Sequence, residues 1–220
     1  MAGEIESVAM RSVEIRVLSL VAAGLLLCGC GSAFESPAAL VNGTKITQGD
    51  LEHQLSVLLT NPQFEAQVRG PGGADRKRDL TRRLLAFLIR ERIVAGYAAR
   101  HGISVSGSEI DQALAQAEAQ SGGKARFDQL LRSRHLSLAD VRDNVRSLLL
   151  EQKVRAAVVG PTSSDQATAQ RQDQAFTAWL ARQLKSSDIS VNPRFGRFDP
   201  AQDVICPIDS TADVASCPAA

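Results

Sequence analysis

A hairpin turn is followed directly by a helix start in the stretch Leu40-Val41-Asn42-Gly43-Thr44-Lys45-Ile46-Thr47-Gln48-Gly49-Asp50-Leu51. Two short apolar arms flank Asn42-Gly43, the strongest signal for a two-residue hairpin, because both central positions of that turn need positive φ. A hairpin this small is not stable alone in water. We therefore expect another strand or a helix to cover it.

The second half of this stretch has a pattern that occurs three times: apolar, Ser or Thr, two other residues, an acid, apolar. It is found at Ile46–Leu51, Val105–Ile110 and Leu136–Val141. The hydroxyl can accept from a backbone N–H of the first turn, and the acid lies where the helix dipole favours negative charge. The flanking apolar pair matches a hydrophobic staple. Three helix starts are predicted.

Apolar spacing extends these starts into a mainly α-helical chain of about six helices. They are expected from Thr47 to before Asn61, from about Arg78 to His101, from Ser106 to Gly122, around Phe127–Leu131, from Ser137 to Gly160, and from about Gln174 to Leu184. Residues 66–77 are interpreted as a loop and residues 162–173 as a polar stretch without periodicity. Ile189-Ser190-Val191 is predicted as a strand, and residues 200–220 as a turn-rich tail.

The N-terminus has the organisation of an export signal. Arg11 and Arg16 precede the apolar run Val17–Leu27, which is too short to cross a bilayer. Leu27-Cys28-Gly29-Cys30 resembles the lipobox of bacterial lipoproteins, in which the cysteine receives acyl chains such as palmitate and becomes the first mature residue. Residues 1–29 are thus expected to be a signal peptide and Cys30 the lipidation site, followed by a tether over residues 30–37. The protein would face the extracytoplasmic side of a cell membrane.

Two alternatives to this N-terminal assignment remain open. An ordinary signal peptide could be cut near Ala33, and translation could begin at Met10, because Glu4 and Glu6 are unusual in a basic leader.

Composition excludes several function classes. Without residues 1–29 the chain has 23 basic and 21 acidic residues, whereas nucleic-acid-binding proteins normally have a clear basic excess. A local basic cluster is interpreted as a solvated helix face; it comprises Arg76, Lys77, Arg78, Arg82 and Arg83. Only 4% of residues are aromatic, so the core must consist mainly of aliphatic side chains.

Cys206 and Cys217 would be the remaining mature cysteines, and outside the cytoplasm a disulfide between them is the simplest assignment. A metal site is the weaker alternative, because no histidine lies near them in the sequence.

No catalytic motif is present. His53, His101 and His135 lie on separate predicted elements, without a metal-ligand spacing. His101 and His135 each fall at a helix C-terminus, where an imidazole suits the dipole. The sequence has no GxSxG, phosphate-loop or dinucleotide motif. We therefore predict no enzymatic activity, no cofactor and no metal.

Several phrases, in order, resemble the N-terminal chaperone module of SurA-type chaperones and PrsA-type foldase lipoproteins. The resemblance covers about residues 38–158, the last helix and Ile189–Gly196. It is carried by Leu40–Thr47 with Asp50-Leu51, Leu88–Val94 running to His101–Ser106, Phe127–Leu131, and Ser137–Arg142 with Leu148–Lys153.

In that family a parvulin-type isomerase domain precedes the last helix, but here only residues 162–173 occupy its place, so no isomerase activity is implied. The resemblance implies a domain over residues 38–198 with a tail over 199–220. It also implies that the strand near Val191 pairs with the hairpin.

These features predict a lipid-anchored holdase for unfolded or newly exported polypeptides. An apolar groove for these clients is predicted from Leu84, Leu88, Val145, Leu149, Phe176 and Trp179. Core packing is the more common role of such apolar stripes. The alternatives are an envelope scaffold that docks one folded partner and, less favoured, a peptidyl-prolyl isomerase.

Overall fold

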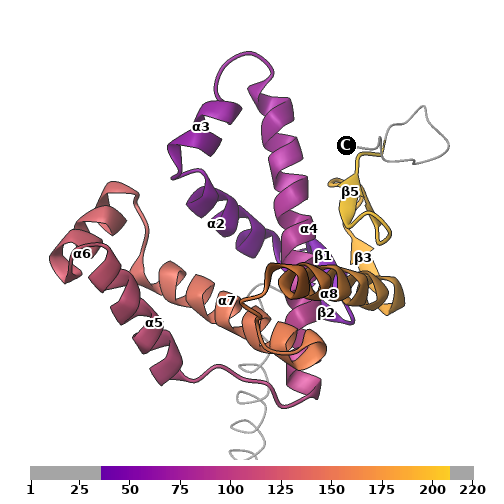
Figure 1. Ribbon diagram of the computed structural model, residues 1–220. Coiled ribbons are helices and arrows are strands. Elements are labelled where there is room, and N and C mark those ends of the chain that lie inside the picture. The colour runs from indigo at the N-terminus through magenta and orange to yellow at the C-terminus, as the bar shows by residue number, and fades with distance from the viewer. Residues whose placement is uncertain (1–35, 209–220) are drawn as a thin grey trace, which may run out of the picture. The chain divides into compact units, whose positions relative to one another are not determined.

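The computed structural model describes residues 36–208, which contain seven helices and five short strands (Figure 1). In chain order they are β1 (Ala39–Val41), β2 (Thr44–Ile46), α2 (Gln48–Leu58), α3 (Pro62–Val68), α4 (Gly73–Arg100), α5 (Gly107–Gln120), α6 (Lys124–Ser133), α7 (Leu138–Val159), α8 (Gln166–Ser186), β3 (Ile189–Val191), β4 (Arg197–Asp199) and β5 (Val204–Cys206). The prediction of a mainly α-helical fold with a small β element is confirmed.

The hairpin forms as predicted, with positive φ at Asn42 (49°) and Gly43 (79°). β1 is the central strand of a three-stranded antiparallel sheet with the order β2-β1-β3, in which Ala39 lies opposite both Ile46 and Val191. The chain segments before α2 and after α8 therefore meet in one sheet. The pairing predicted from the resemblance is confirmed.

The three predicted helix starts are also confirmed, at Thr47, Ser106 and Ser137. Each hydroxyl accepts a hydrogen bond from the backbone N–H three residues later. Thr47 and Ser106 form complete capping boxes, whereas Asp140, three residues after Ser137, bonds to the Ser137 hydroxyl and to His53 of another helix.

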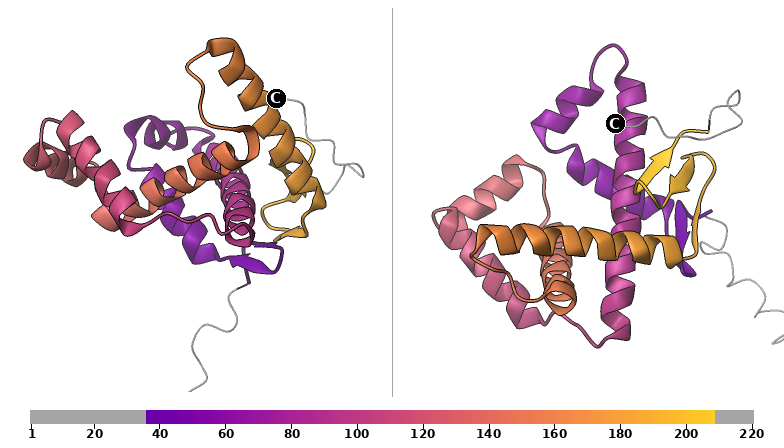
Figure 2. Two further views of the ribbon diagram at one scale, coloured as in Figure 1. Left: turned by 60° about the horizontal axis from the view of Figure 1, so that its bottom comes forward. Right: turned by 45° about the vertical axis from the view of Figure 1, so that its right-hand side comes forward.

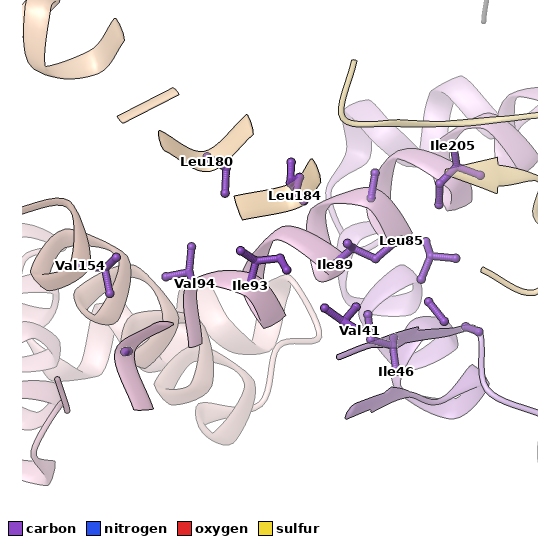
Figure 3. Packing of buried hydrophobic residues seen from close by; sticks show 14 of the residues in the cluster. Val41, Ile46, Leu85, Ile89, Ile93, Val94, Val154, Leu180, Leu184 and Ile205 are labelled. Atoms are coloured by element: carbon purple, nitrogen blue, oxygen red, sulfur yellow. The ribbon is translucent and has the colours of Figure 1, made fainter. Parts of the chain in front are cut away.

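The main hydrophobic core surrounds α4, which is the longest helix and carries Leu85, Ile89 and Ile93 among its buried residues. The hairpin, α7, α8 and β5 all contribute side chains to this core (Figure 3). From these elements come Val41, Ile46, Val154, Leu180, Leu184 and Ile205. Aliphatic residues dominate the core, as the low aromatic content requires.

A second, smaller cluster joins α5 and α6 to the first half of α7 around Ile110 and Phe127. Figures 1 and 2 place this helix pair and the strands on opposite sides of α4. Lys153 of α7 reaches the start of α5, where its Nζ lies 2.7 Å from both the carbonyl oxygen of Ser104 and a carboxylate oxygen of Glu109.

The loop predicted for residues 66–77 is wrong, because α3 and the first turn of α4 occupy most of this segment. The helix that starts at Thr47 ends before Asn61 as predicted, with Leu58 as its last residue, and Pro62 is then the first residue of α3, behind an Asn61 side chain that accepts from the Gln63 N–H. None of the seven residues of α3 is buried, so this helix does not place an apolar stripe in the core. Arg76 of α4 donates to carbonyl oxygens at the end of α3, including that of Arg69.

The predicted start of the last helix is also wrong: α8 begins at Gln166, eight residues before Gln174. Asp165 caps it by accepting from the Thr168 N–H. Its first two turns are mostly solvent-exposed and carry mainly polar residues, so apolar periodicity gives no signal there.

The predicted turn-rich tail contains a strand that belongs to the core. β4 and β5 form an antiparallel hairpin in which Arg197 lies opposite Cys206. Ile205 is buried in the main core, and Arg90 of α4 forms an ion pair with Asp203 at 3.0 Å. Packed structure therefore continues beyond residue 198, because Ile205 belongs to the main core and Asp203 pairs with α4.

Candidate functional site

A groove lies between α2, α4 and the first half of α7. It consists of two adjoining pockets of about 360 Å³ and 320 Å³, which share Gln54, Phe87, Glu91, Asp143 and Ser147 as lining residues. We call it the α2–α4–α7 groove. α2 begins directly after the hairpin and packs against α4, where it forms one wall of the groove.

Apolar side chains line the groove at several points. Phe87 is the most exposed of them: it lines both pockets, and 44% of its surface is open to solvent. Leu88, Val57, Val141 and Leu150 add aliphatic surface from all three helices. An accessible aromatic ring within a concave surface can bind an apolar side chain of a ligand.

Polar side chains surround this apolar surface. Gln54 of α2 and Asn144 of α7 line it with amide groups, which can both donate to and accept from a peptide backbone. The groove thus offers the two kinds of contact that an extended polypeptide needs.

One hydrogen bond connects the two outer helices of the groove. His53 Nε2 of α2 lies 2.7 Å from Asp140 Oδ1 of α7. The second carboxylate oxygen of Asp140 accepts from the Ser137 hydroxyl at 2.6 Å. These bonds, first to Ser137 and then to His53, lower the pKa of Asp140. One Asp140 oxygen thus bonds to a neighbouring helix, and the other bonds to the N-cap residue of its own helix.

The junction of α4 and α7 carries two carboxylates, Glu91 and Glu151. Glu91 is half-buried and accepts a hydrogen bond from Ser147. Burial raises the pKa of Glu91, the Ser147 hydrogen bond and the charge of Arg92 oppose this effect, and the neighbouring charge of Glu151 adds to it. Two carboxylates and the charge of Arg92 therefore interact at this point of the groove.

Of the six predicted polypeptide-binding residues, Leu88 is the one that lines the groove. Phe176 and Trp179 are 4% and 7% exposed and belong to the main core, where Trp179 packs edge-on against Tyr97. Leu84 packs against the same core, and Val145 and Leu149 pack against the second cluster. Burial of α8 on the rest of the fold removes its aromatic stripe from the surface.

Sequence reasoning missed Phe87, Glu91 and His53. A large aromatic residue outside the apolar stripe of its helix was the available signal for Phe87. No sequence signal placed His53 beside Asp140, 87 positions away.

The other predicted site residues lie outside this groove. Cys206 is buried on β5 and is disulfide-bonded. Cys30 and Cys217 lie outside the described residues, so lipidation and the Cys206–Cys217 pairing stay predictions. His101 is the C-terminal cap residue of α4 and stacks on Tyr97, and His135 follows α6 with a positive φ of 52°.

Two further findings concern the described residues. Between Ser36 and Ile208, no three His, Cys, Asp or Glu side chains gather in a way that could hold a metal ion. No helix in that same range combines the length and apolar character needed to cross a membrane.

A comparison with models of protein families identifies the family of this chain. The model of the SurA-like N-terminal domain matches residues 9–155, and no parvulin-type isomerase domain is matched. No curated protein matches the chain. SurA-like domains bind polypeptide substrates as chaperones. Because the match spans about two thirds of the 220 residues and the observed fold agrees with it, the chain belongs to the SurA-like N-terminal domain family.

Proposed function

We propose that this protein is a lipid-anchored, extracytoplasmic holdase that binds unfolded or newly exported polypeptides in the α2–α4–α7 groove. The observation that carries the proposal is the position of Phe87, an aromatic residue that is 44% exposed and lines both pockets. In a stable fold an exposed large apolar side chain in a concave surface is typical of a binding site.

The chemistry of the groove suits weak binding without strict sequence choice. Its apolar contacts are spread over three helices, and the amides of Gln54 and Asn144 can bond any peptide backbone. The described residues offer no group of metal ligands, and His53 is the groove's only histidine among them. Holding a chain needs only such contacts, since no bond is made or broken.

Aggregation of a chemically denatured model protein tests this function. The purified protein should suppress light scattering at several-fold molar excess, and Phe87→Ser should weaken the suppression. Leu148→Ser is the matched control: Leu148 is 56% exposed on α7 but does not line the groove. No suppression by the wild-type protein, or equal loss in both variants, would contradict the proposal.

The membrane anchor is proposed from the sequence alone, from the order of Arg11, Arg16, the apolar run and Cys30. Two acyl chains on Cys30 would hold the protein firmly, because each buried methylene contributes ~0.8 kcal/mol. Cells grown with an alkyne-tagged fatty acid should label the wild-type protein and Cys28→Ala, but not Cys30→Ala. Labelling of Cys30→Ala would refute lipidation at this residue.

Affinity capture separates the holdase from a scaffold. A broad set of unfolded clients, lost in Phe87→Ser, supports the holdase, whereas one stoichiometric folded partner would favour scaffolding. Turnover in a prolyl-isomerisation assay would instead identify an enzyme.

A further inference from the structure

Two of the carboxylates that line the groove, Glu91 and Glu151, are not held in an ion pair within the part of the chain that the structure describes, although the charge of Arg92 acts on Glu91. Three others are already engaged: Asp50 closes the capping box of α2, Asp140 bonds to His53 and Ser137, and Asp143 pairs with Arg146. Within residues 36–208, neither Glu91 nor Glu151 forms an ion pair. Arg92 lines the same pocket and its charge partly offsets that of Glu91, so these three groups together carry one excess negative charge.

The environment of these two carboxylates favours a cation from outside the fold. Glu91 is half-buried, so its charge is less well solvated than that of a surface carboxylate. Glu151 faces the same pocket and is close enough to repel Glu91. A positive group between them would relieve both the repulsion and the poor solvation.

Apolar surface adjoins these carboxylates on both helices. Phe87 precedes Glu91 by four residues and therefore lies on the same face of α4, one turn away. Leu150 directly precedes Glu151 and lines the same pocket. A Lys or Arg side chain has an apolar stem and a charged head, so it can lie along such a surface while its head reaches a carboxylate.

We propose that the α2–α4–α7 groove selects extended polypeptide segments in which a Lys or Arg lies within a few residues of a large apolar side chain. The apolar side chain packs on Phe87, and the cation lies between Glu91 and Glu151. This inference rests on the proposed holdase function and names the class of client segment that the groove prefers.

Labelled peptides test the preference by fluorescence anisotropy. Three short unstructured peptides share the same apolar residues and differ at two positions, which are Lys, Gln or Glu. The wild-type protein should bind the Lys peptide about five- to tenfold more tightly than the Gln peptide, as expected for half-buried charge pairs, and the Glu peptide most weakly.

Two double variants locate the source of the preference. Glu91→Gln/Glu151→Gln should reduce the Lys preference to less than about twofold and leave the Kd of the Gln peptide unchanged. Glu52→Gln/Glu118→Gln changes the net charge equally at residues that do not line the groove and should keep the full preference. Circular dichroism melts verify that both variants fold.

The outcomes distinguish this inference from the function on which it rests. Equal binding of the Lys and Gln peptides by the wild-type protein overturns the charge preference but leaves the holdase function intact. An equal loss of preference in both double variants also overturns it, because net charge would then be the cause. If no peptide binds and aggregation is not suppressed, the holdase function itself is wrong.

Discussion

Asn42 connects two parts of the chain that are about 146 residues apart, and its replacement tests how the fold is closed. Its side-chain oxygen accepts from the Asp188 backbone N–H at 2.9 Å, and its amide nitrogen donates to the Ser187 hydroxyl at 3.2 Å. Its own φ is 49°, which few non-glycine residues adopt. Asn42 thus contributes both hydrogen bonds and a backbone conformation.

Two substitutions separate these contributions. Asn42→Gly keeps the positive φ and removes both side-chain hydrogen bonds; at roughly 0.5–1 kcal/mol per exposed bond, the free energy of unfolding should fall by about 1–2 kcal/mol. Asn42→Ala removes the same bonds and forces a Cβ into the left-handed region, which costs roughly 1 kcal/mol more. The expected loss is about 2–3 kcal/mol, or a decrease in Tm of about 5–10 °C.

Urea unfolding followed by the fluorescence of Trp179, the single tryptophan, measures both values. Trp179 is buried in the core that the sheet covers, so its signal reports loss of the fold. Lys45→Ala, at an exposed position of the same hairpin, should change stability by less than about 0.5 kcal/mol. Wild-type midpoints for both Asn42 variants would refute the assigned role, and equal midpoints for Gly and Ala would refute the backbone contribution.

Three further predictions concern packing and charge. Ile205→Ala should lower the unfolding free energy by about 2–3 kcal/mol in urea titrations, because this side chain is 6% exposed in the core. Val204→Ala, at 37% exposure on the same strand, should cost less than about 1 kcal/mol, and equal losses would show that the β4–β5 hairpin is not packed as described. Hydrogen bonds from Lys153 and from the N-cap residue of α5 lower the pKa of Glu109 from 4.5 to about 2. Because the pKa of this carboxyl is lower in the folded than in the unfolded state, ionised Glu109 stabilises the fold above pH 4.5, and this stabilisation is lost as the pH falls toward 2. Urea midpoints should therefore fall more between pH 5 and pH 3 for the wild-type protein than for Glu109→Gln, and parallel decreases would contradict this assignment. Gly73→Ala should lower Tm by several degrees in thermal melts, because its Cβ would collide with a backbone carbonyl at the end of α3; an unchanged Tm would mean that this contact yields easily.

Elements that depend on neighbouring residues were predicted well from the sequence. The turn at Asn42-Gly43 and the caps at Thr47, Ser106 and Ser137 form where expected, because each requires only a φ preference or a hydrogen bond within three residues. The errors have a common physical cause. α3 and the first half of α8 are stabilised by caps and exposed polar faces, so a method that follows apolar periodicity does not detect them.

The candidate site was predicted less well, and Trp179 and Phe87 show why. Both are aromatic residues on helices, yet the first is buried in the core and the second is exposed in the groove. Periodicity shows which residues share a helix face, but not whether that face meets another helix or solvent.

By itself, then, the sequence determined the helix starts, the hairpin and the need for a third strand, since these follow from short-range steric and hydrogen-bonding rules. The tertiary structure alone decided that α2 and α7 lie against α4 with a groove between them. That arrangement brings His53 to Asp140 and Glu91 to Glu151. Such pairs depend on helix crossings that many distant side chains determine together, and so no short segment of the sequence specifies them.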